Sequence, residues 1–268
     1  MKSNALSSKT ETLPLPLPEP EDGSTRMLQE QLAYLKLPTV IDQFSGLAQK
    51  ASTENWGYLH FLCVLIEMEY NLKRQRAIER RVANAHFPVI KSLAQFEWSW
   101  PKKIPETLIK DLFRLQFIKR KENVVFLGGV GVGKSHLAIA LGYHAAVNGK
   151  KVLFTNTIDV INALILAKKS GRLKLELNRY IKPDLIILDE LGYLPIDKAG
   201  ADLLFQVISG RYEVASTIIT SNRAFRDWPE IFNNDSTLTS ALLDRVLHHA
   251  HSVVIEGKSY RMKDKAEK

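Results

Sequence analysis

A glycine-rich loop between a strand-like and a helix-like apolar run is the feature that most constrains this fold. In "VVFLGGVGVGKSHLAIALG", residues 124–142, the loop from Gly128 to Ser135 matches G-x-x-x-x-G-K-[ST] in full. Glycines let backbone N–H groups turn inward around phosphate oxygens, in conformations that a Cβ penalises. The helix that follows presents its positive N-terminal end to the same phosphates. The loop therefore predicts a nucleotide phosphate site.

The C-terminal half of the chain alternates apolar strand-like runs with helical stretches. The runs span residues 123–127, 151–155, 184–190, 216–222 and 252–257. Short β-branched runs separated by helices are typical of a parallel sheet that is covered on both faces. We therefore predict an α/β fold, a three-layer P-loop domain with a five-stranded parallel sheet.

The part of the chain before this domain divides by composition. Residues 1–25 carry prolines at alternate positions, which favour an extended arm that is disordered in isolation. Residues 26–115 have a helical pattern and are predicted to form a small all-helical N-terminal domain. The nucleotide domain is then expected at 116–262, and a basic tail at 263–268.

One long helix is predicted within the helical part, from about Glu54 to Asn84, with Thr53 as its N-cap. Its first half is apolar, whereas its second half contains the basic run "KRQRAIERR". Lys73, Arg76 and Arg80 recur at spacings of three and four residues, so they share one helix face. Contact with DNA, plain solvation and docking of a partner protein all remain open for this face.

Polar residues follow the loop and the third apolar run at positions that suit phosphate chemistry. Lys134 can reach the β- and γ-phosphates, and the hydroxyl of Ser135 can ligate Mg²⁺. Asp189 ends "LIILD" at the carboxyl edge of the sheet, where it would hold Mg²⁺ through water. Glu190 is placed to orient or deprotonate a water that attacks the γ-phosphate. The alternative interpretation is two acids in a surface turn.

Three further residues are candidates with weaker signals. Asn222 ends the next strand and could touch the attacking water, although Asn is also a common strand terminator. Arg245 lies on a predicted helix and could neutralise phosphoryl charge, often from a neighbouring subunit, or form a surface pair with Asp244. Arg261, after the last strand, is a further candidate for contacting nucleotide.

Composition and missing motifs exclude several classes of protein. The longest apolar run, residues 61–66, is far too short to cross a bilayer, and no secretory signal is visible. The single cysteine, Cys63, is expected in the core and fits a reducing cytoplasm. The strand that ends "TSNRAF" lacks an N-K-x-D segment, which argues against a GTPase. The Asp-Glu pair argues for hydrolysis rather than phosphate transfer to a small molecule.

The order of loop, Asp-Glu pair, strand-terminal Asn and late Arg resembles the AAA+ ATPases. The segments "DELGYLPID", "ADLLFQVISGRYE", "STIITSN", "TSALLDRVLHHAH" and "GKSYR" look like the IstB family of transposition helper ATPases, relatives of the helicase loader DnaC and the initiator DnaA. The resemblance covers roughly residues 27–262. It implies ATP as the nucleotide, Mg²⁺ as its metal, and a domain without a C-terminal lid, since seven residues follow Arg261.

The resemblance also implies roles for individual residues. Asn222 would be the sensor 1 residue, Arg245 an arginine finger that acts between subunits, and Arg261 a sensor-2-like arginine. The expected nucleotide-binding residues are Gly128, Gly129, Gly131, Gly133, Lys134, Ser135, His136, Asp189 and Arg261. Of these, Ser135 and Asp189 are also expected to bind the metal. The expected catalytic residues are Lys134, Glu190, Asn222 and Arg245.

The family further implies ATP-dependent oligomers on double-stranded DNA that recruit and stimulate a partner transposase, which would be IstA-like. A DnaC-like helicase loader, built on nearly the same core, is the first alternative. The second is a DNA adaptor that does not hydrolyse nucleotide, in which the nucleotide only organises assembly. Retention of Lys134, Asp189, Glu190 and Arg245 argues against this second alternative.

Basic residues are concentrated in two parts of the chain. Residues 26–121 carry sixteen basic and nine acidic side chains, and residues 166–182 carry six basic and one acidic. Initiator-type AAA+ proteins have an extra helical element near the second segment, which lines the inner surface of the oligomer. We predict phosphate contacts of low sequence specificity for Lys168, Lys169, Arg172, Lys174 and Arg179. A solvated amphipathic helix is the alternative.

Overall fold

The computed structural model describes residues 23–263, which fall into two compact units divided between Gln75 and Arg76. The Pro-rich arm of residues 1–25, except for its last three residues, and the basic tail beyond Lys263 lie outside the described residues. Among the helices that are described, none is long and apolar enough to cross a membrane.

The N-terminal unit consists of α1 (Ser24–Tyr34), α2 (Pro38–Thr53) and the first part of α3 (Tyr58–Asn84). Leu32, Val40 and Leu65 form its small core. The side chain of Glu69, only 3% exposed, accepts the N–H groups of Thr39 (2.8 Å) and Val40. Burial raises the pKa of Glu69, but these donors outweigh it and hold the pKa below its usual value. Glu69 thus caps the start of α2.

Two predictions for this region were wrong. Thr53 does not begin a helix but ends α2, and its hydroxyl donates to the carbonyl of Gln49 at 3.0 Å. Asn55 adopts a left-handed backbone (φ +54°), which breaks the helix, so α3 begins only at Tyr58. Cys63 is exposed rather than buried. The unit is too small to cover every apolar residue of α3, and it buries Leu65 instead.

The second unit is a three-layer α/β domain, as the sequence predicts. Its elements in chain order, after the end of α3, are η1 Leu93–Gln95, α4 Glu106–Leu112, α5 Gln116–Arg120, β1 Asn123–Gly128, α6 Lys134–Val147, β2 Val152–Asn156, α7 Thr157–Lys169, α8 Leu173–Ile181, β3 Leu185–Leu191, α9 Lys198–Arg211, β4 Ser216–Ser221, η2 Phe225–Asp227, α10 Trp228–Ile231, α11 Ser236–Leu247, β5 Ala250–Ile255 and η3 Tyr260–Met262.

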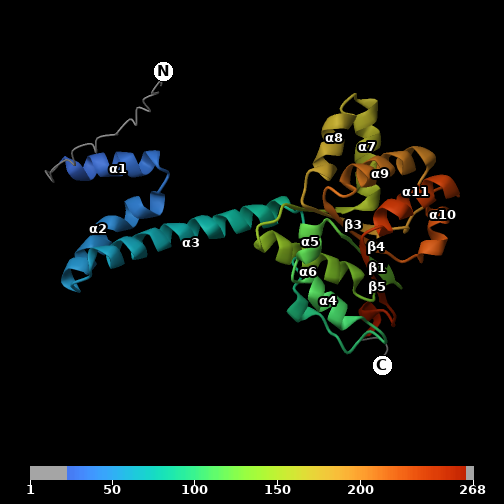
Figure 1. Cartoon of the computed structure of the whole chain (residues 1–268), viewed down its shortest axis with the longest axis horizontal. Coiled ribbons are helices and arrows are strands. Elements are labelled where there is room, and N and C mark those ends of the chain that lie inside the picture. The colour runs from blue at the N-terminus through green and yellow to red at the C-terminus, as the bar shows by residue number, and fades with distance from the viewer. Residues whose placement is uncertain (1–22, 264–268) are drawn as a thin grey trace, which may run out of the picture. The chain divides into compact units, whose positions relative to one another are not determined.

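The five strands are parallel and follow the order β2-β3-β4-β1-β5. Helices α7, α9 and α11 lie on one face of the sheet, and α4, α5 and α6 lie on the other (Figure 1). The apolar side chains of each set pack against the face that they cover. The register aligns both Leu127 of β1 and Leu191 of β3 with Ser221 of β4. The ends of β1, β3 and β4 therefore meet at one edge of the sheet.

Residues 76–115, which we expected in the N-terminal domain, pack with the nucleotide domain. The carbonyl of Ala85 accepts the N–H of Phe154 at 2.8 Å. Ala85, Ile109 and Leu112 are buried in the same core as α6. The division at Gln75/Arg76 thus falls before the boundary predicted at 115/116, because the apolar residues of 82–115 complete the face of the sheet that α6 covers.

Candidate functional site

The P-loop is shaped by glycines that no other residue replaces without strain. Gly131 (φ +76°) and Gly133 (φ +101°) adopt left-handed conformations. A Cβ on Gly133 would lie 2.6 Å from the ring of Phe96, and one on Gly131 would collide with Ser259. The loop is therefore held between the segment before β1 and the segment after β5, and both approach it too closely to admit a side chain.

Lys134 and Ser135 begin α6 and face a cavity of about 680 Å³, a size typical of ligand sites. The Lys134 ammonium donates to the carbonyl oxygens of Gly128 (2.8 Å) and Gly129 (2.6 Å). Burial lowers the pKa of Lys134, and the carboxylate of Asp189 acts against this shift. Both predicted residues thus lie where the loop and the helix N-terminus converge.

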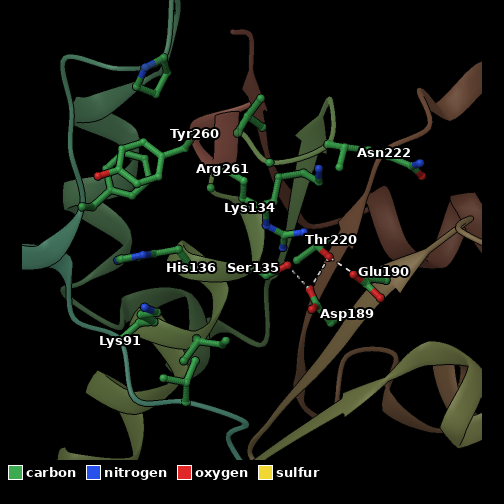
Figure 2. Close-up of a pocket in the computed structure, with 18 of the residues that line it drawn as sticks. Lys91, Lys134, Ser135, His136, Asp189, Glu190, Thr220, Asn222, Tyr260 and Arg261 are labelled. Atoms are coloured by element: carbon green, nitrogen blue, oxygen red, sulfur yellow. Dashed lines mark hydrogen bonds between the residues drawn. The ribbon is translucent and has the colours of Figure 1, made fainter. Parts of the chain in front are cut away.

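Asp189 is the buried acid of the site, with 7% of its surface exposed. Its Oδ1 accepts the hydroxyls of Ser135 (2.9 Å) and Thr220 (2.5 Å), as Figure 2 shows. Burial raises the pKa of Asp189, and these two hydroxyl donors oppose the shift because they stabilise the ionised form. A serine hydroxyl and a carboxylate at this distance are the oxygen ligands that Mg²⁺ prefers.

Glu190 projects from an irregularity in β3. The pairing of β3 with β4 shifts register between Leu188 and Leu191, and Glu190 takes a left-handed backbone (φ +58°). Its N–H donates to the hydroxyl of Thr220 at 3.0 Å, and its exposed carboxylate accepts the side-chain amide of Asn156 at 2.9 Å. The bulge therefore directs two consecutive acids to different positions around one cavity.

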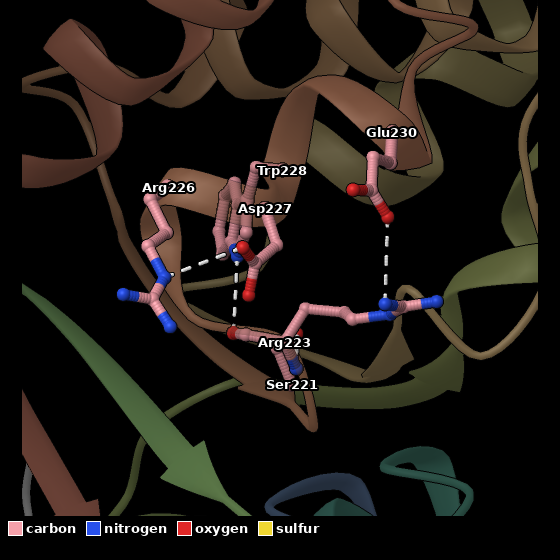
Figure 3. Close-up of polar contacts among 6 residues, drawn as sticks. All are labelled: Ser221, Arg223, Arg226, Asp227, Trp228 and Glu230. Carbon is pink, nitrogen blue, oxygen red and sulfur yellow. Dashed lines mark hydrogen bonds and ion pairs between the residues drawn. The ribbon is translucent and has the colours of Figure 1, made fainter.

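Asn222 follows β4 and lines the cavity, and the turn beyond it is firmly held (Figure 3). The Ser221 hydroxyl donates to the carbonyl of Leu191 (2.7 Å) and accepts the N–H of Arg223 (3.1 Å). The indole N–H of Trp228, a fully buried residue, donates to the Arg223 carbonyl at 3.4 Å. These bonds fix the backbone on either side of Asn222.

The other predicted residues are distributed unequally. Arg261 lines the same cavity and lies beside Lys134, whose pKa its charge lowers (Figure 2). His136 also lines the cavity, but its Nε2 pairs with the carbonyl of Ser92 at 3.0 Å. Arg245 lies outside this lining, on α11, where its guanidinium donates to Ala241 and stacks on the Phe205 ring. Within the chain, the fold therefore keeps Arg245 away from the P-loop.

The predicted DNA-contact residues lie on exposed helix surfaces. Lys168, Lys169, Arg172, Lys174 and Arg179 are all exposed on or between α7 and α8. Among them, Arg179 pairs with Glu176 at 3.2 Å, which occupies its guanidinium. In α3, Lys73 pairs with the buried Glu69 at 3.4 Å, so it has a structural partner as well as an exposed head. Arg76 and Arg80 are exposed.

Several residues that line the cavity are not predicted from the sequence. Thr220 sits in an apolar strand, where a threonine is an ordinary β-forming residue. The segment from Pro88 to Pro101 has no periodic pattern, yet it contributes Lys91, Phe96, Glu97 and Trp100 to the lining. Trp100 and Tyr260 are separated by most of the nucleotide domain in sequence, and only the fold brings them together.

Comparison with known proteins agrees with this geometry. A family model described as IstB-like ATP binding protein matches residues 30–268. The chain belongs to this family. It is 40% identical over 238 residues to the insertion sequence IS21 putative ATP-binding protein of Pseudomonas aeruginosa, and the match covers 89% of each chain. The resemblance to the IstB family expected from the sequence is thereby confirmed.

A second relative of this IstB-like chain is the insertion sequence IS5376 putative ATP-binding protein of Geobacillus stearothermophilus, 40% identical over 89% of this chain and 94% of that protein. The fold is similar to DnaI (TM-score 0.54, 17% identity, 62% of this chain and 90% of DnaI). It is also similar to the replication initiator DnaA bound to AMPPCP and single-stranded DNA (TM-score 0.53, 22% identity, 66% and 54%). At these identities the likeness concerns the fold.

Proposed function

We propose that this IstB-like protein is a cytoplasmic, DNA-stimulated ATPase that assembles on double-stranded DNA and acts as a transposition helper for a partner transposase. The observation that carries the proposal is the convergence of Lys134, Ser135, Asp189 and Glu190 on one cavity, in a chain whose relatives belong to insertion sequences.

The binding half of the mechanism rests on the P-loop. Its backbone N–H groups and the N-terminus of α6 surround the phosphates, and Lys134 exchanges its carbonyl partners for phosphate oxygens. The Ser135 hydroxyl and the Asp189 carboxylate would hold Mg²⁺, which supplies neutralising charge to the β- and γ-phosphates. Burial raises the pKa of Asp189, and the Thr220 hydroxyl opposes this shift and orients the carboxylate.

The hydrolytic half rests on Glu190. Its carboxylate borders the cavity and is anchored by the Asn156 amide, so it orients a water toward the γ-phosphate and accepts a proton from it. Asn222 faces the same cavity from the end of β4 and contacts that water or the phosphate. This arrangement of an acid and an amide favours hydrolysis over transfer to another acceptor.

Arg245 completes the site from a neighbouring subunit. Its contacts with Ala241 and Phe205 keep it out of the cavity of its own chain, so it reaches phosphate only in an assembly. An arginine supplied in this way neutralises charge that develops during hydrolysis, and it makes turnover depend on neighbouring subunits. Assembly on DNA would then stimulate hydrolysis.

The exposed basic residues of α7 and α8 are the proposed DNA contacts. Lys168, Lys169 and Arg172 are exposed at the tip of this helix pair, and Lys174 is exposed in the first turn of α8. Binding through phosphates alone is tolerant of sequence and weakens steeply as salt rises.

The proposal is tested by measuring ATP hydrolysis with and without DNA, and particle size on DNA under ATP, ADP and no nucleotide. We expect DNA-stimulated turnover and growth of the assembly with ATP. Alanines at Lys168, Lys169 and Arg172 should weaken DNA binding and lower the slope of log affinity against log salt by about 2–3. Alanines at Arg114, Lys119 and Arg120, which remove the same charge from another exposed surface, are the matched control.

Two outcomes would contradict parts of the proposal. No turnover in either condition would favour an adaptor in which ATP only organises assembly. Particles that remain monomeric whatever the nucleotide would refute the assembly model. Addition of a purified transposase from the same insertion sequence then tests the partner, since its activity should rise only with the ATP-bound assembly.

A further inference from the structure

The chain does not leave the domain after β5 but returns to the P-loop. The N–H of Tyr260, in η3, donates to the carbonyl of Gly131 at 2.8 Å. The indole N–H of Trp100 donates to the carbonyl of Lys258 at 3.0 Å, and Lys103 and Glu256 form an antiparallel bridge. The segment after the last strand is thus attached to the phosphate loop and to the segment before β1.

Glu97 lies at the centre of this attachment. Its Oε2 accepts the hydroxyl of Tyr260 at 3.0 Å, and its Oε1 accepts the Lys263 ammonium at 2.7 Å. The bonds from Lys263 and Tyr260 hold the pKa of Glu97 below its usual value. A single carboxylate therefore binds two residues of the C-terminal turn, one on each side of Arg261.

Aromatic contacts reinforce the same arrangement. The rings of Trp100 and Tyr260 meet edge to face, with centroids 5.7 Å apart. The Lys263 ammonium lies 5.5 Å from the Trp100 ring and 5.6 Å from the Tyr260 ring, within the range of cation–π attraction. Glu97, Trp100, Tyr260 and Lys263 form a cluster that we call the C-terminal clasp.

The clasp determines where Arg261 lies. Arg261 stands between Tyr260 and Lys263, which are both fixed to Glu97, and it lines the cavity close to Lys134 (Figure 2). The charge of Arg261 lowers the pKa of Lys134, so the two cations repel each other across the cavity. A polyphosphate between them would relieve this repulsion, because it places negative charge next to both.

We propose that Glu97 is a positioning residue: through Tyr260 and Lys263 it holds Arg261 over the P-loop of the same subunit, so that Arg261 contacts the phosphates of bound ATP. This inference rests on the nucleotide site described under the proposed function. The residue that contacts the phosphates would then be held by two segments of the same domain, the turn after β5 and the segment before β1.

The test is a charge exchange measured by the dissociation constants for ATP and ADP. Glu97→Lys and Lys263→Glu each place like charges together and release the turn, so ATP binding should weaken about tenfold or more, as for loss of one charged hydrogen bond. The double variant restores opposite charges and should recover most of the affinity. Tyr260→Phe, which removes one hydroxyl, should show a smaller loss in the same direction.

Two comparisons separate positioning from a merely structural role. In an Arg261→Ala background, Glu97→Lys should add little further loss, because the residue that it positions is gone. The same exchange at the exposed pair Asp111 and Arg114, 3.3 Å apart on and just after α4, should leave ATP binding unchanged. Melting temperatures of all variants identify any that fail to fold.

The results that overturn the clasp differ from those that overturn the wider function. Wild-type ATP affinity in both single variants, or equal losses from Glu97→Lys with and without Arg261, refutes the positioning role alone. A double variant that folds yet stays as weak as the singles refutes it too. Absence of ATP binding by the wild-type protein would instead remove the basis of the proposed function itself.

Discussion

Replacing Thr220 by valine removes a hydroxyl from the centre of the site and changes almost nothing in shape. That hydroxyl donates to Asp189 at 2.5 Å and accepts the N–H of Glu190 at 3.0 Å, and the side chain is buried. A hydrogen bond to a charged group contributes about 1.5–3 kcal/mol, and a stranded N–H near solvent costs about 1 kcal/mol at most. We expect Thr220→Val to lower the free energy of unfolding by about 2–3 kcal/mol.

Thermal unfolding and ATP turnover both measure this change. For a unit of this size the loss corresponds to a melting temperature lower by about 5–10 °C. Turnover with Mg²⁺ should fall about tenfold to a hundredfold, the usual effect of removing a group that orients a metal ligand, if Asp189 binds Mg²⁺ as we propose. Thr220→Ser keeps the hydroxyl and should retain most of the activity, which separates the hydrogen bonds from the volume of the side chain.

The pH dependence has a definite sign. Burial already raises the pKa of Asp189, and loss of the Thr220 donor raises it further, so the acid limb of the activity profile should move to higher pH. The difference in unfolding free energy between wild type and variant should have its largest value at neutral pH. It should shrink as pH falls through the folded-state pKa of Asp189. A variant with wild-type turnover and an unmoved acid limb would refute this reasoning.

Three further predictions follow from other contacts. Arg245→Ala should bind ATP normally but lose turnover about 10³-fold. Mixing this variant with Lys134→Ala should restore part of the activity, because each variant supplies the residue that the other lacks. No recovery in mixed samples would contradict action between subunits. Arg211→Met strands buried carbonyls, including those of Tyr180 and Ile181, so urea unfolding should show a loss of about 3 kcal/mol or more. Asn156→Ala frees the Glu190 carboxylate, so kcat should fall with little change in ATP affinity; equal losses in both would argue against an orienting role.

The sheet and the P-loop were predictable because their physics is local. Runs of apolar β-branched residues such as 184–190 have few alternatives to a buried strand, and β3 runs from Leu185 to Leu191. The glycines before Lys134 are required by backbone conformation, which the structure bears out at Gly131 and Gly133. The carboxyl edge of a parallel sheet then brings Asp189 to the loop without further information.

The features that could not be predicted from the sequence depend on contacts between segments that are distant in the chain. Thr220 is an ordinary strand residue until β4 is placed beside β3. Glu97 is an ordinary surface acid until the turn at Tyr260 returns to it, 163 positions later. Cys63 was misplaced for a related reason, because an apolar helical run indicates that a core exists but not which of its residues that core is large enough to cover.

The backbone of Glu190 has a consequence for how this protein can change. A left-handed conformation costs a residue with a Cβ about 1–2 kcal/mol, and glycine avoids that cost. Glu190→Gly should therefore give a protein that is more heat-resistant but lacks the carboxylate that we propose as the general base. Selection for stability and selection for turnover therefore favour different residues at this position. A library variant that is stabilised by a change here would tend to be inactive.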